Sequence, residues 1–358
     1  MINLAQEGFS HEQVLQALQF QEGRRQMRYE LWLLRGETAI YPLPLRDFSF
    51  TCDCLADVKY TGRFTFQSLP DIRWRSDRLQ LRMVLTLKGK ELIYPFPRLR
   101  AARISGDRML TVTACDETAI LSQSSLGERP LIRAGTRYTS FLTGLLEKAG
   151  FSHVLITPSD ALFSADREDW EPETSLASLC SQLLSEIGYR SLEATRLGGI
   201  RSGPYEPPGP LHAKISYHEK NSILLPGCSR ELMNDCCPNR FIGYVSNPEQ
   251  PPMQYEYLNN NPASPTSPHN NGGYTITAVR RFDSIADRES LEKNVRRWAL
   301  ETEALYEYLE LQTAPMPHHE VQEVLFIDCR EASGLYTEIG WTLEREQMTH
   351  RLRRCRMD

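Results

Sequence analysis

The sequence predicts an α+β protein that is mainly β, with two β-rich regions on either side of a compact α/β unit. Three observations support this prediction. Short segments of alternating apolar and polar residues fill positions 28–115, a period that indicates β-strands. Positions 136–194 carry mainly helical spacing instead. Alternation returns after position 205 and is interrupted by one long helical pattern.

The N-terminal stretch has the pattern of a short helix followed by many strands. Ser10 and Gln13 resemble a capping box, and Gly23 ends the helical pattern. Period-two segments then follow, separated by Gly, Pro or Asp, and such closely spaced short strands indicate an antiparallel sandwich or barrel. The expected strands are residues 29–34, 38–41, 48–52, 59–66, 79–85, 98–104 and 109–114.

The α/β unit is expected to contain two helices, each ended by a glycine that can adopt a left-handed conformation. The apolar positions of the first helix run from Phe141 to Ala149, and those of the second run from Leu176 to Ile187. The expected start signals, end signals and neighbouring strands are Thr139 or Ser140, Gly150, residues 154–156, Thr174 or Ser175, Gly188 and residues 189–194.

The second β-rich region contains a long segment of turn-forming residues. Residues 257–273 are rich in Asn, Pro, Ser and Gly and lack periodicity, so we expect an exposed, mobile loop. Strands are expected at residues 212–217, 241–245, 274–279, 321–327, 335–343 and 348–355.

A heptad-like helix is expected between residues 282 and 317. Its apolar positions are four and three residues apart, and Pro315 and Pro317 stop it. Such a seam either packs on its own domain or supplies a helix contact in an oligomer, and the pattern fits both. The seam comprises Leu291, Val295, Trp298, Thr302, Leu305 and Leu309.

The composition is that of an ordinary globular chain. Of 358 residues, 41% are hydrophobic and 24% are charged, and the net charge of −5 argues against a generally basic nucleic-acid-binding protein. No run approaches the roughly 20 apolar residues of a membrane helix, and the features of a signal peptide are missing from the N-terminus. Nine scattered cysteines, an odd number, indicate free thiols in a reducing cytoplasm.

The charge is distributed unevenly along the chain. Residues 63–108 carry 11 Lys and Arg against four Asp and Glu, a local net charge of +7, which leaves −12 on the rest. Most of these basic residues alternate with apolar ones, as on one solvated or partner-facing side of a sheet. Arg73, Arg75 and Arg78 are therefore candidate contacts with an acidic partner. Salt-dependent DNA binding by this region is a weaker alternative.

The sequence lacks the common catalytic motifs. It contains no phosphate-binding Gly-rich loop and no nucleophile elbow. The best metal candidate is His318-His319-Glu320, with Glu323 nearby. Adjacent histidines on a strand point to opposite faces, so a polar connection before a strand is the favoured interpretation. We predict no catalytic, cofactor-binding or metal-binding residues.

Other sets of reactive residue types are also better explained without chemistry. On an extended strand His212 and His218 lie about 20 Å apart, too far for one ion. Two close cysteine pairs lack a matched second pair, which favours buried thiols; they are Cys52 with Cys54 and Cys236 with Cys237. An acidic cluster could correspond to the carboxylate pair of a glycosidase. A simpler explanation is that the last of these carboxylates precede a helix N-terminus, where the helix dipole stabilises negative charge. This cluster comprises Asp166, Glu168, Asp169, Glu171 and Glu173.

Three segments follow the first β-rich region in a particular order. They are residues 135–151 (GTRYTSFLTGLLEKAGF), residues 170–176 (WEPETSL) leading into 183–189 (LLSEIGY), and the terminal pair 335–343 and 348–355. In this order they resemble the baseplate hub or tail-tube-initiator proteins of long-tailed bacteriophages and related contractile injection particles. The resemblance covers residues 28–356 and rests on segment order and pattern, without a catalytic signature.

The resemblance implies two tube-like antiparallel β-barrel domains, a small α/β domain between them and a helical insertion in the second barrel. It also implies a homotrimeric ring that adapts a hexameric tail tube to a threefold tip or spike. The corresponding divisions are residues 1–27 (N-terminal helical arm), 28–120 (first barrel), 121–200 (α/β domain), 201–281 with 318–358 (second barrel) and 282–317 (inserted helix).

We therefore predict a non-enzymatic structural protein of the virion, assembled in the host bacterial cytoplasm and without cofactors. Its expected partners are further copies of itself, a tail tube protein and tip, spike or other baseplate proteins, with DNA only as cargo in the channel and no membrane-spanning segment. The heptad seam and the three arginines are its candidate contacts. The alternative is a cell-wall (peptidoglycan) hydrolase that uses the acidic cluster around Asp169.

Overall fold

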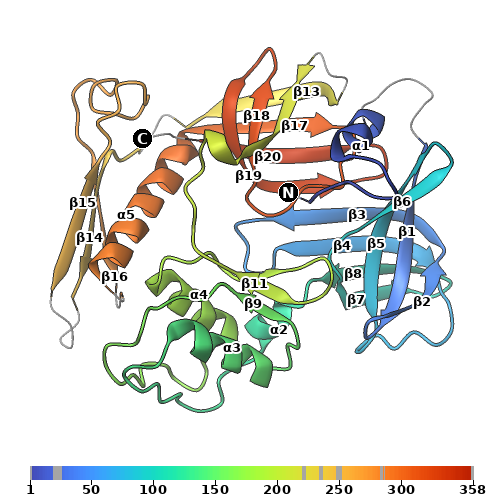
Figure 1. Ribbon diagram of the computed structural model, residues 1–358, viewed down its shortest axis with the longest axis horizontal. Helices are drawn as coiled ribbons and strands as arrows, with labels where there is room; N and C mark the ends of the chain where they lie inside the picture. Colours follow the sequence, from blue (N-terminus) through green and yellow to red (C-terminus); the bar gives the residue numbers. More distant parts are fainter. Residues whose placement is uncertain are drawn as a thin grey trace.

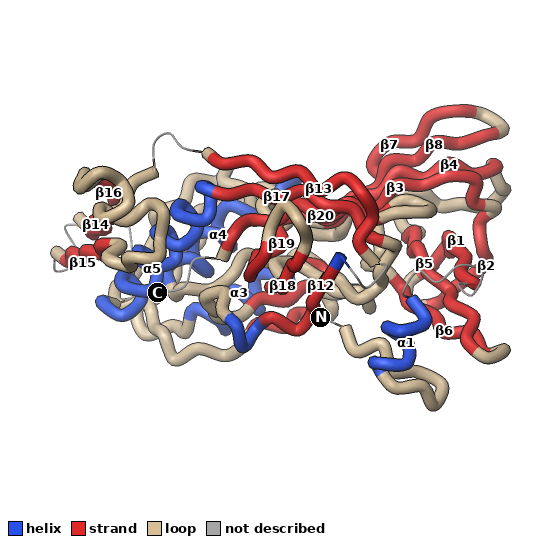
Figure 2. The backbone as a smooth tube through the Cα atoms, turned by 90° about the horizontal axis from the view of Figure 1, so that it is seen from above, coloured by secondary structure: helices blue, strands red, loops and turns tan. Residues whose placement is uncertain are grey.

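The computed structural model describes residues 2–18, 26–219, 223–233, 237–246, 252–282, 285 and 287–355. It confirms a mainly β protein in which most strand pairs are antiparallel. Figure 1 shows a large sheet through the centre, an α/β unit below it and a separate helix-and-sheet unit at the left. Figure 2 shows the large sheet as a curved layer, with a second sheet packed beneath it at one end.

The first β-rich region is divided between two sheets. A four-stranded sheet has the order β2-β1-β5-β6. Its strands are β1 (Gln26–Arg35), β2 (Thr38–Leu43), β5 (Arg78–Leu87) and β6 (Lys90–Pro95). The other strands, β3 (Leu45–Asp53), β4 (Tyr60–Gln67), β7 (Arg100–Gly106) and β8 (Met109–Cys115), belong to the large sheet. All seven expected strands are present, and β6 is additional because its two buried residues, Leu92 and Tyr94, are too few to establish a period.

The large sheet joins the two β-rich regions edge to edge. Its order is β13-β17-β20-β19-β3-β4-β8-β7, and β18 pairs with both β19 and β12. The strands from the second region are β12 (Ala213–His218), β13 (Leu224–Leu232), β17 (Glu307–Thr313), β18 (Val324–Asp328), β19 (Ser333–Leu343) and β20 (Met348–Arg354). Residues 333–337 of β19 pair with β18, whereas residues 340–343 pair with β3. The two regions are therefore continuous through β19, and the closure of each into a barrel stays a prediction.

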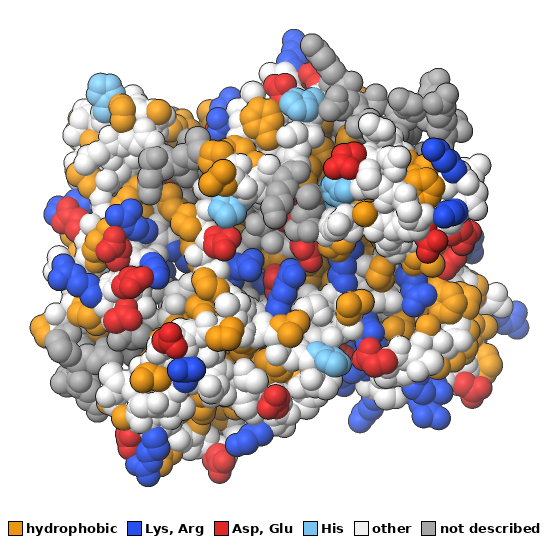
Figure 3. Space-filling model, in the orientation of Figure 1, with side chains coloured by type: hydrophobic (Ala, Val, Ile, Leu, Met, Phe, Trp, Pro, Cys, Tyr) orange, Lys and Arg blue, Asp and Glu red, His pale blue; other side chains and the backbone are white. Residues whose placement is uncertain are grey.

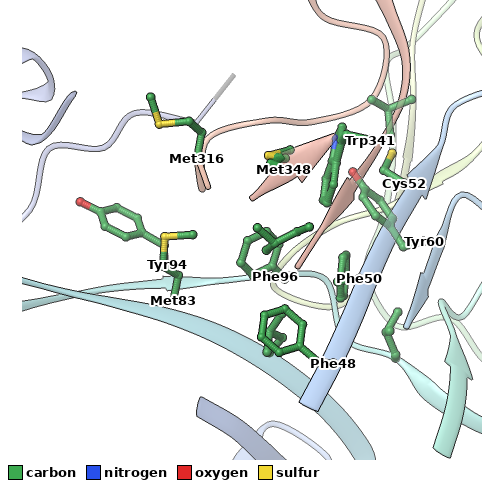
Figure 4. Packing of buried hydrophobic residues seen from close by; sticks show 14 of the residues in the cluster. Phe48, Phe50, Cys52, Tyr60, Met83, Tyr94, Phe96, Met316, Trp341 and Met348 are labelled. Atoms are coloured by element: carbon green, nitrogen blue, oxygen red, sulfur yellow. The ribbon is translucent and has the colours of Figure 1, made fainter. Parts of the chain in front are cut away.

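One hydrophobic core lies beneath this junction. Phe50 of β3 stacks on Trp341 of β19 with ring centroids 5.9 Å apart, and Phe96 packs edge-on against the same indole at 6.2 Å. Figure 4 shows these side chains together with Cys52, Tyr60 and Met348 in one cluster. Burial of each large apolar side chain contributes about 1.5–3 kcal/mol, so this shared core couples the two β-rich regions.

The N-terminal helix packs on its own chain. α1 (His11–Leu18) buries Val14 and Leu18 in the same core. The predicted capping box is confirmed, because Ser10 N donates to Gln13 Oε1 and Gln13 N donates to Ser10 Oγ. Tyr94 of β6 donates to the carbonyl of Leu4 at 2.7 Å. The N-terminal arm therefore covers the four-stranded sheet.

The α/β unit has its own core. It contains α2 (Ala119–Gln123), α3 (Tyr138–Lys148), α4 (Leu176–Glu186) and a three-stranded sheet of β9 (Val154–Ile156), β10 (Glu193–Ala194) and β11 (Ile200–Ser202). Ser175 caps α4 as predicted. The expected start of α3 is wrong: Arg137 is its N-cap and gives no side-chain hydrogen bond, because burial of Tyr138 begins the helix earlier than Thr139. The expected strand at 189–194 forms only at its last two residues.

A third unit lies beside the second β-rich region, where a single barrel was expected. It contains β14 (Arg240–Val245), β15 (Met253–Leu258), β16 (Thr277–Phe282) and α5 (Arg288–Glu303), and its core is separate from the large one. The expected helix over 282–317 is too long. After α5 a short 3₁₀ turn, Ala304–Tyr306, leads into β17, whose alternating burial overrides the heptad spacing. A second 3₁₀ turn, Pro210–His212, precedes β12.

Candidate functional site

Two of the three arginines that the sequence singles out, Arg73 and Arg75, lie in the turn between β4 and β5, and the third, Arg78, is the first residue of β5. The buried carboxylate of Asp77 holds this turn by accepting a hydrogen bond from the backbone nitrogen of Arg73 at 2.9 Å. Arg73 and Arg75 are exposed, and neither makes an ion pair within the described part of the chain. Arg78 differs, because its Nε lies 2.6 Å from Oε1 of Glu117. Arg73 and Arg75 therefore remain available to a partner, whereas the charge of Arg78 is balanced within the chain.

Further positive charge from residues 63–108 is also balanced in space. Both terminal nitrogens of Arg98 lie 2.8 Å from the carboxylate of Glu37. The guanidinium of Arg82 keeps its charge but lies 4.6 Å above the ring of Trp32. Figure 3 shows Lys and Arg side chains interspersed with Asp and Glu over one face of the molecule. The net charge of +7 counted over residues 63–108 therefore overstates the positive potential at the surface of this region. The exposed arginines of this window that lack an ion pair to a described residue are Arg63, Arg73, Arg75, Arg103 and Arg108.

The seam of α5 faces its own sheet. Leu291 and Val295 are fully buried, and Trp298 packs edge-on against Phe241 at 5.1 Å. Gly243 permits this close approach, because a Cβ there would lie 2.2 Å from Cγ2 of Val295. Leu291 and Val295 therefore pack within their own unit, and a contact of this seam with a partner stays a prediction.

The last two seam positions are not on the helix. Leu305 lies in the 3₁₀ turn and Leu309 is buried in β17. Leu305 and Leu309 are therefore not part of α5, and their contact with a partner stays a prediction. Trp298 lies on the helix and is half-buried, so it remains partly accessible.

The same unit exposes apolar side chains on β16 and on the segment just before it, which the sequence does not single out. Tyr274, Ile276 and Val279 are 73%, 41% and 61% exposed. β16 pairs only with β14, so no strand in the described part of the chain covers its other edge. An open edge with apolar side chains is a typical protein-binding feature. The alternation at residues 274–279 predicts a strand here, but it does not show which edge of that strand is paired.

The segment 257–273 is not simply an exposed loop. Its centre is buried, with Asn259, Thr266 and Ser267 at most 3% exposed. The side-chain amide of Asn239 donates to the carbonyls of Thr266 and Tyr274, both at 3.0 Å. Short polar side chains therefore replace an apolar core here, because Asn239 and residues within the segment satisfy its buried backbone groups. The expectation of full exposure is wrong for this part.

Three members of the acidic cluster form ion pairs with three different arginines. Asp166 pairs with Arg133 at 2.5 Å, and Glu171 accepts both Nε and Nη2 of Arg129. The backbone nitrogen of Ala134 and the Arg133 guanidinium lower the pKa of Asp166, whereas a general acid needs a raised pKa. Asp169 pairs with Arg167, whose side chain is largely buried, at 2.6 Å. This geometry does not resemble a paired-carboxylate active site.

The histidines and cysteines considered as metal ligands fall into separate places. His212 and His218 pair with different acids, Glu206 at 3.7 Å and Asp328 at 3.2 Å. The sulfur atoms of Cys52 and Cys54 lie 3.9 Å apart in the core, and Cys236 lies outside the described residues. His318 and His319 lie in the connection between β17 and β18, as the favoured interpretation expects, but both side chains are buried rather than solvated.

A cavity of about 660 Å³ lies between the α/β unit, α5 and the second β-rich region. Its wall mixes opposite charges, which fits a polar junction between units better than a site for one charged ligand. The charged residues that line it are Arg190, Arg201, Glu206, Arg297, Glu301, Glu320, Glu323, Arg353 and Arg354.

Comparisons with known proteins give a match in structure alone. No protein-family model and no curated protein sequence matches this chain. A tail protein from Neisseria meningitidis MC58 superposes with a TM-score of 0.64 at 12% identity, covering 91% of this chain and 96% of that chain. The 43 kDa tail protein of prophage MuSo2 from Shewanella oneidensis gives 0.60 at 9% identity, covering 90% and 98%. A prophage tail protein from Listeria monocytogenes EGD-e gives 0.57 at 12% identity, covering 92% and 95%.

The chain has the fold of phage tail proteins. The match extends over nearly the full length of both chains in each pair, so the resemblance that the segment order predicts is confirmed at the level of fold. Within this tail-protein fold, the accessible candidates for contacts lie at opposite ends: the Arg73–Arg75 turn at one and strand β16 at the other. None of the helices in the described part of the tail-protein fold is long and apolar enough to cross a membrane.

Proposed function

We propose that this chain is a non-enzymatic hub of a phage-type tail or contractile injection particle. Three copies form a ring that adapts a hexameric tail tube to a threefold tip or spike. The observation that carries the proposal is the similarity in fold to tail proteins from end to end, over 90% to 92% of this chain.

The continuous large sheet suits such a role mechanically. It runs through both β-rich regions as a single hydrogen-bonded element, so a load on one region is transmitted to the other through β19 and β3. The sheet face opposite the core is polar at this junction, where the hydroxyls of Thr51 and Thr342 lie 3.2 Å apart. A polar, rigid face docks neighbours without exposing a large apolar patch in the free protein.

The proposed partners follow from this role. They are copies of the chain itself, a tail tube protein, and tip, spike or other baseplate proteins, while DNA passes the channel only as cargo. The protein is assembled in the host cytoplasm and ends in the virion. It acts through geometry and charge rather than through a reaction.

Light scattering after size-exclusion chromatography and negative-stain images test the proposal. We expect a ring of three chains with threefold symmetry. The double variant Arg73→Glu/Arg75→Glu should form fewer rings, because it reverses two exposed charges that lack an intrachain ion pair to a described residue. The matched control, Arg129→Glu/Arg133→Glu, reverses two exposed charges on the α/β unit and should leave the rings intact.

Two outcomes would contradict these expectations separately. A monomer at every concentration at which the partners assemble would overturn the ring. Normal rings from the Arg73→Glu/Arg75→Glu variant would be consistent with the proposed ring but would show that this turn is not one of its contacts.

A further inference from the structure

A cluster of ionisable side chains lies inside the second β-rich region. His319, Glu338 of β19 and His350 of β20 are all at most 1% exposed. Nδ1 of His319 lies 2.7 Å from Oε2 of Glu338, and Nδ1 of His350 lies 2.5 Å from Oε1 of the same carboxylate. The potential ligand atoms of the three residues all lie within 4.8 Å of one another. Such a group is costly in an apolar core unless each member has a strong partner.

A β-bulge places Glu338 in this cluster. In the pairing of β19 with β20, Glu338 opposes Leu352 and Gly340 opposes Arg351, so Ile339 is an extra residue. Side chains alternate along a strand, and the extra residue allows both Glu338 and Trp341 to face the core. Bulges commonly re-aim a side chain at a functional position.

Each histidine has a second partner on its outer nitrogen. Nε2 of His319 lies 2.5 Å from the hydroxyl of Tyr217. Nε2 of His350 lies 2.8 Å from Oγ1 of Thr313, which itself donates to the carbonyl of Ala314 at 2.8 Å. Because the Thr313 proton is already used, Nε2 of His350 is the donor in this contact. Histidines that bind a metal through one nitrogen characteristically donate from the other in this way.

A second carboxylate approaches the same point. Oε2 of Glu323 lies 3.7 Å from Nδ1 of His319, and the carbonyl of Glu323 accepts the backbone N–H of Glu338 at 2.8 Å. Two carboxylates and two neutral imidazoles balance the charge of a divalent cation. Ligands around a tetrahedral zinc ion lie about 3.4 Å apart, so the carboxylate and the rings need to separate by less than about 1 Å.

We propose that Nδ1 of His319, Nδ1 of His350 and the carboxylate of Glu338 bind a divalent transition-metal ion, with Glu323 as the nearest further ligand. Zinc suits this set of imidazole and carboxylate ligands. The ion links the segment before β18 to β19 and β20 at the point where β19 changes its partner from β18 to β3. Its role is structural, because its surroundings are fully buried.

Metal content and optical spectroscopy of the full-length chain test this proposal. The protein is purified without a metal-binding tag, refolded with zinc, dialysed and measured by mass spectrometry of the elements. We expect about one zinc ion per chain. Replacement by cobalt(II) should give the visible absorption of a tetrahedral ion, and a chelator should abolish the absorption and lower the Tm.

Variants separate metal binding from a purely hydrogen-bonded cluster. His350→Leu should abolish the zinc and the cobalt absorption. Tyr217→Phe should weaken metal affinity about 10-fold or more, because it removes an outer partner of a ligand. The matched control is His318→Leu: this neighbouring ring is equally buried and has no hydrogen-bond partner in the described part of the chain, so the control should keep its metal.

The outcomes that overturn the proposal are equally specific. A natural chain that retains no zinc after refolding in excess zinc overturns it, as does a His350→Leu variant that binds as much zinc as the natural chain. If His350→Leu does not fold, the cobalt spectrum of the natural chain decides, since no tetrahedral absorption would mean that the three residues only share protons.

Discussion

Two buried carboxylates, one in the α/β unit and one in the second β-rich region, are held by the same kinds of partner. Glu186 of α4 accepts hydrogen bonds from the guanidinium of Arg167 at 2.6 Å and from the hydroxyl of Tyr138 at 2.8 Å. Glu307 of β17 accepts from the guanidinium of Arg230 at 3.0 Å and from the hydroxyl of Tyr336. Each site therefore contains one carboxylate, one arginine and one tyrosine, and Glu186 also accepts a hydrogen bond from Nε2 of Gln182 at 3.2 Å.

The two sites nevertheless differ in the direction of the pKa shift. Burial raises the pKa of Glu186 despite the bonds from its partners, whereas the bonds from Arg230 and Tyr336 lower the pKa of Glu307 despite its burial. The arginines explain the difference in part, because the side chain of Arg167 is 8% exposed and that of Arg230 is 42% exposed. Similar contacts thus have opposite consequences for the carboxyl pKa, and the depth of the ion pair is the main difference between the two sites.

The largest expected effect comes from removing the buried arginine. Arg167→Met should destabilise the α/β unit by about 3–5 kcal/mol, because it leaves the charge of Glu186 buried. Arg230→Met should cost only about 1–2 kcal/mol, since water reaches that pair. Hydrogen exchange of α3 and α4, compared with that of β17 and β19, measures the two local effects. Equal losses of stability in the two variants would show that the burial of the ion pair does not determine the size of the effect.

The pH dependence of the two regions should have opposite signs. A carboxyl whose pKa is raised in the folded state favours folding most below its ordinary value of 4.5, so the contribution of Glu186 falls as the pH rises through its folded pKa. For Glu307, with a lowered pKa, the contribution is full above 4.5 and is lost as the pH falls through its folded pKa.

Glutamine variants isolate these contributions. Glu186→Gln should flatten the decline in protection of α3 and α4 between pH 4.5 and neutral pH. Glu307→Gln should cost about 1.5–3 kcal/mol at neutral pH and remove the acid sensitivity of β17. Denaturant-dependent hydrogen exchange at several pH values measures both. Parallel pH profiles for the two regions of the natural protein would contradict the prediction.

The tyrosine hydroxyls allow a finer comparison. Tyr138→Phe and Tyr336→Phe each remove one hydrogen bond to a carboxylate without creating a cavity, and each should cost about 1–1.5 kcal/mol. Tyr138→Phe should also raise the pKa of Glu186 further, because it removes a donor to the charged form. Urea unfolding followed at both regions provides the measurement, and a loss above about 3 kcal/mol in either variant would indicate a packing change instead.

The smallest effect is expected at an exposed pair of the same chemical type. Arg129 and Glu171 form a bidentate contact on the surface of the α/β unit, with 56% and 62% of their side chains exposed. Arg129→Ala should change stability by about 0–1 kcal/mol, an effect that salt reduces further. A thermal unfolding series at low and high salt measures this, and a salt-independent loss comparable to that of Arg167→Met would contradict the prediction.

Local patterns predict much of the fold. The alternation at residues 48–52 and 335–343, the Ser10–Gln13 capping box and the Ser175 cap all act within a few residues, and the structure confirms each of them. The heptad spacing fails beyond Glu303, because Leu309 satisfies both a helical and a strand period. A tertiary contact, the pairing of β17 with β20, decides between them.

The candidate sites depend even more on distant contacts. The sequence identifies Arg73 and Arg75 as basic and His318-His319-Glu320 as potential ligands. It contains no sign that Arg78 meets Glu117, or that His319 meets a glutamate brought to it by a bulge in β19. Those partners are supplied by strands and segments that are far apart in the chain.

By itself, then, the sequence determined the mainly β class, the positions of most strands, the two helices of the α/β unit and the order of segments that resembles tail proteins. Backbone propensity, side-chain period and capping depend on residues close together in the chain, so they can be recognised from the sequence. Only the tertiary structure decided that β19 joins β3, which charges neutralise each other and which polar groups are buried. These outcomes depend on distance and burial, which are properties of the packed chain alone.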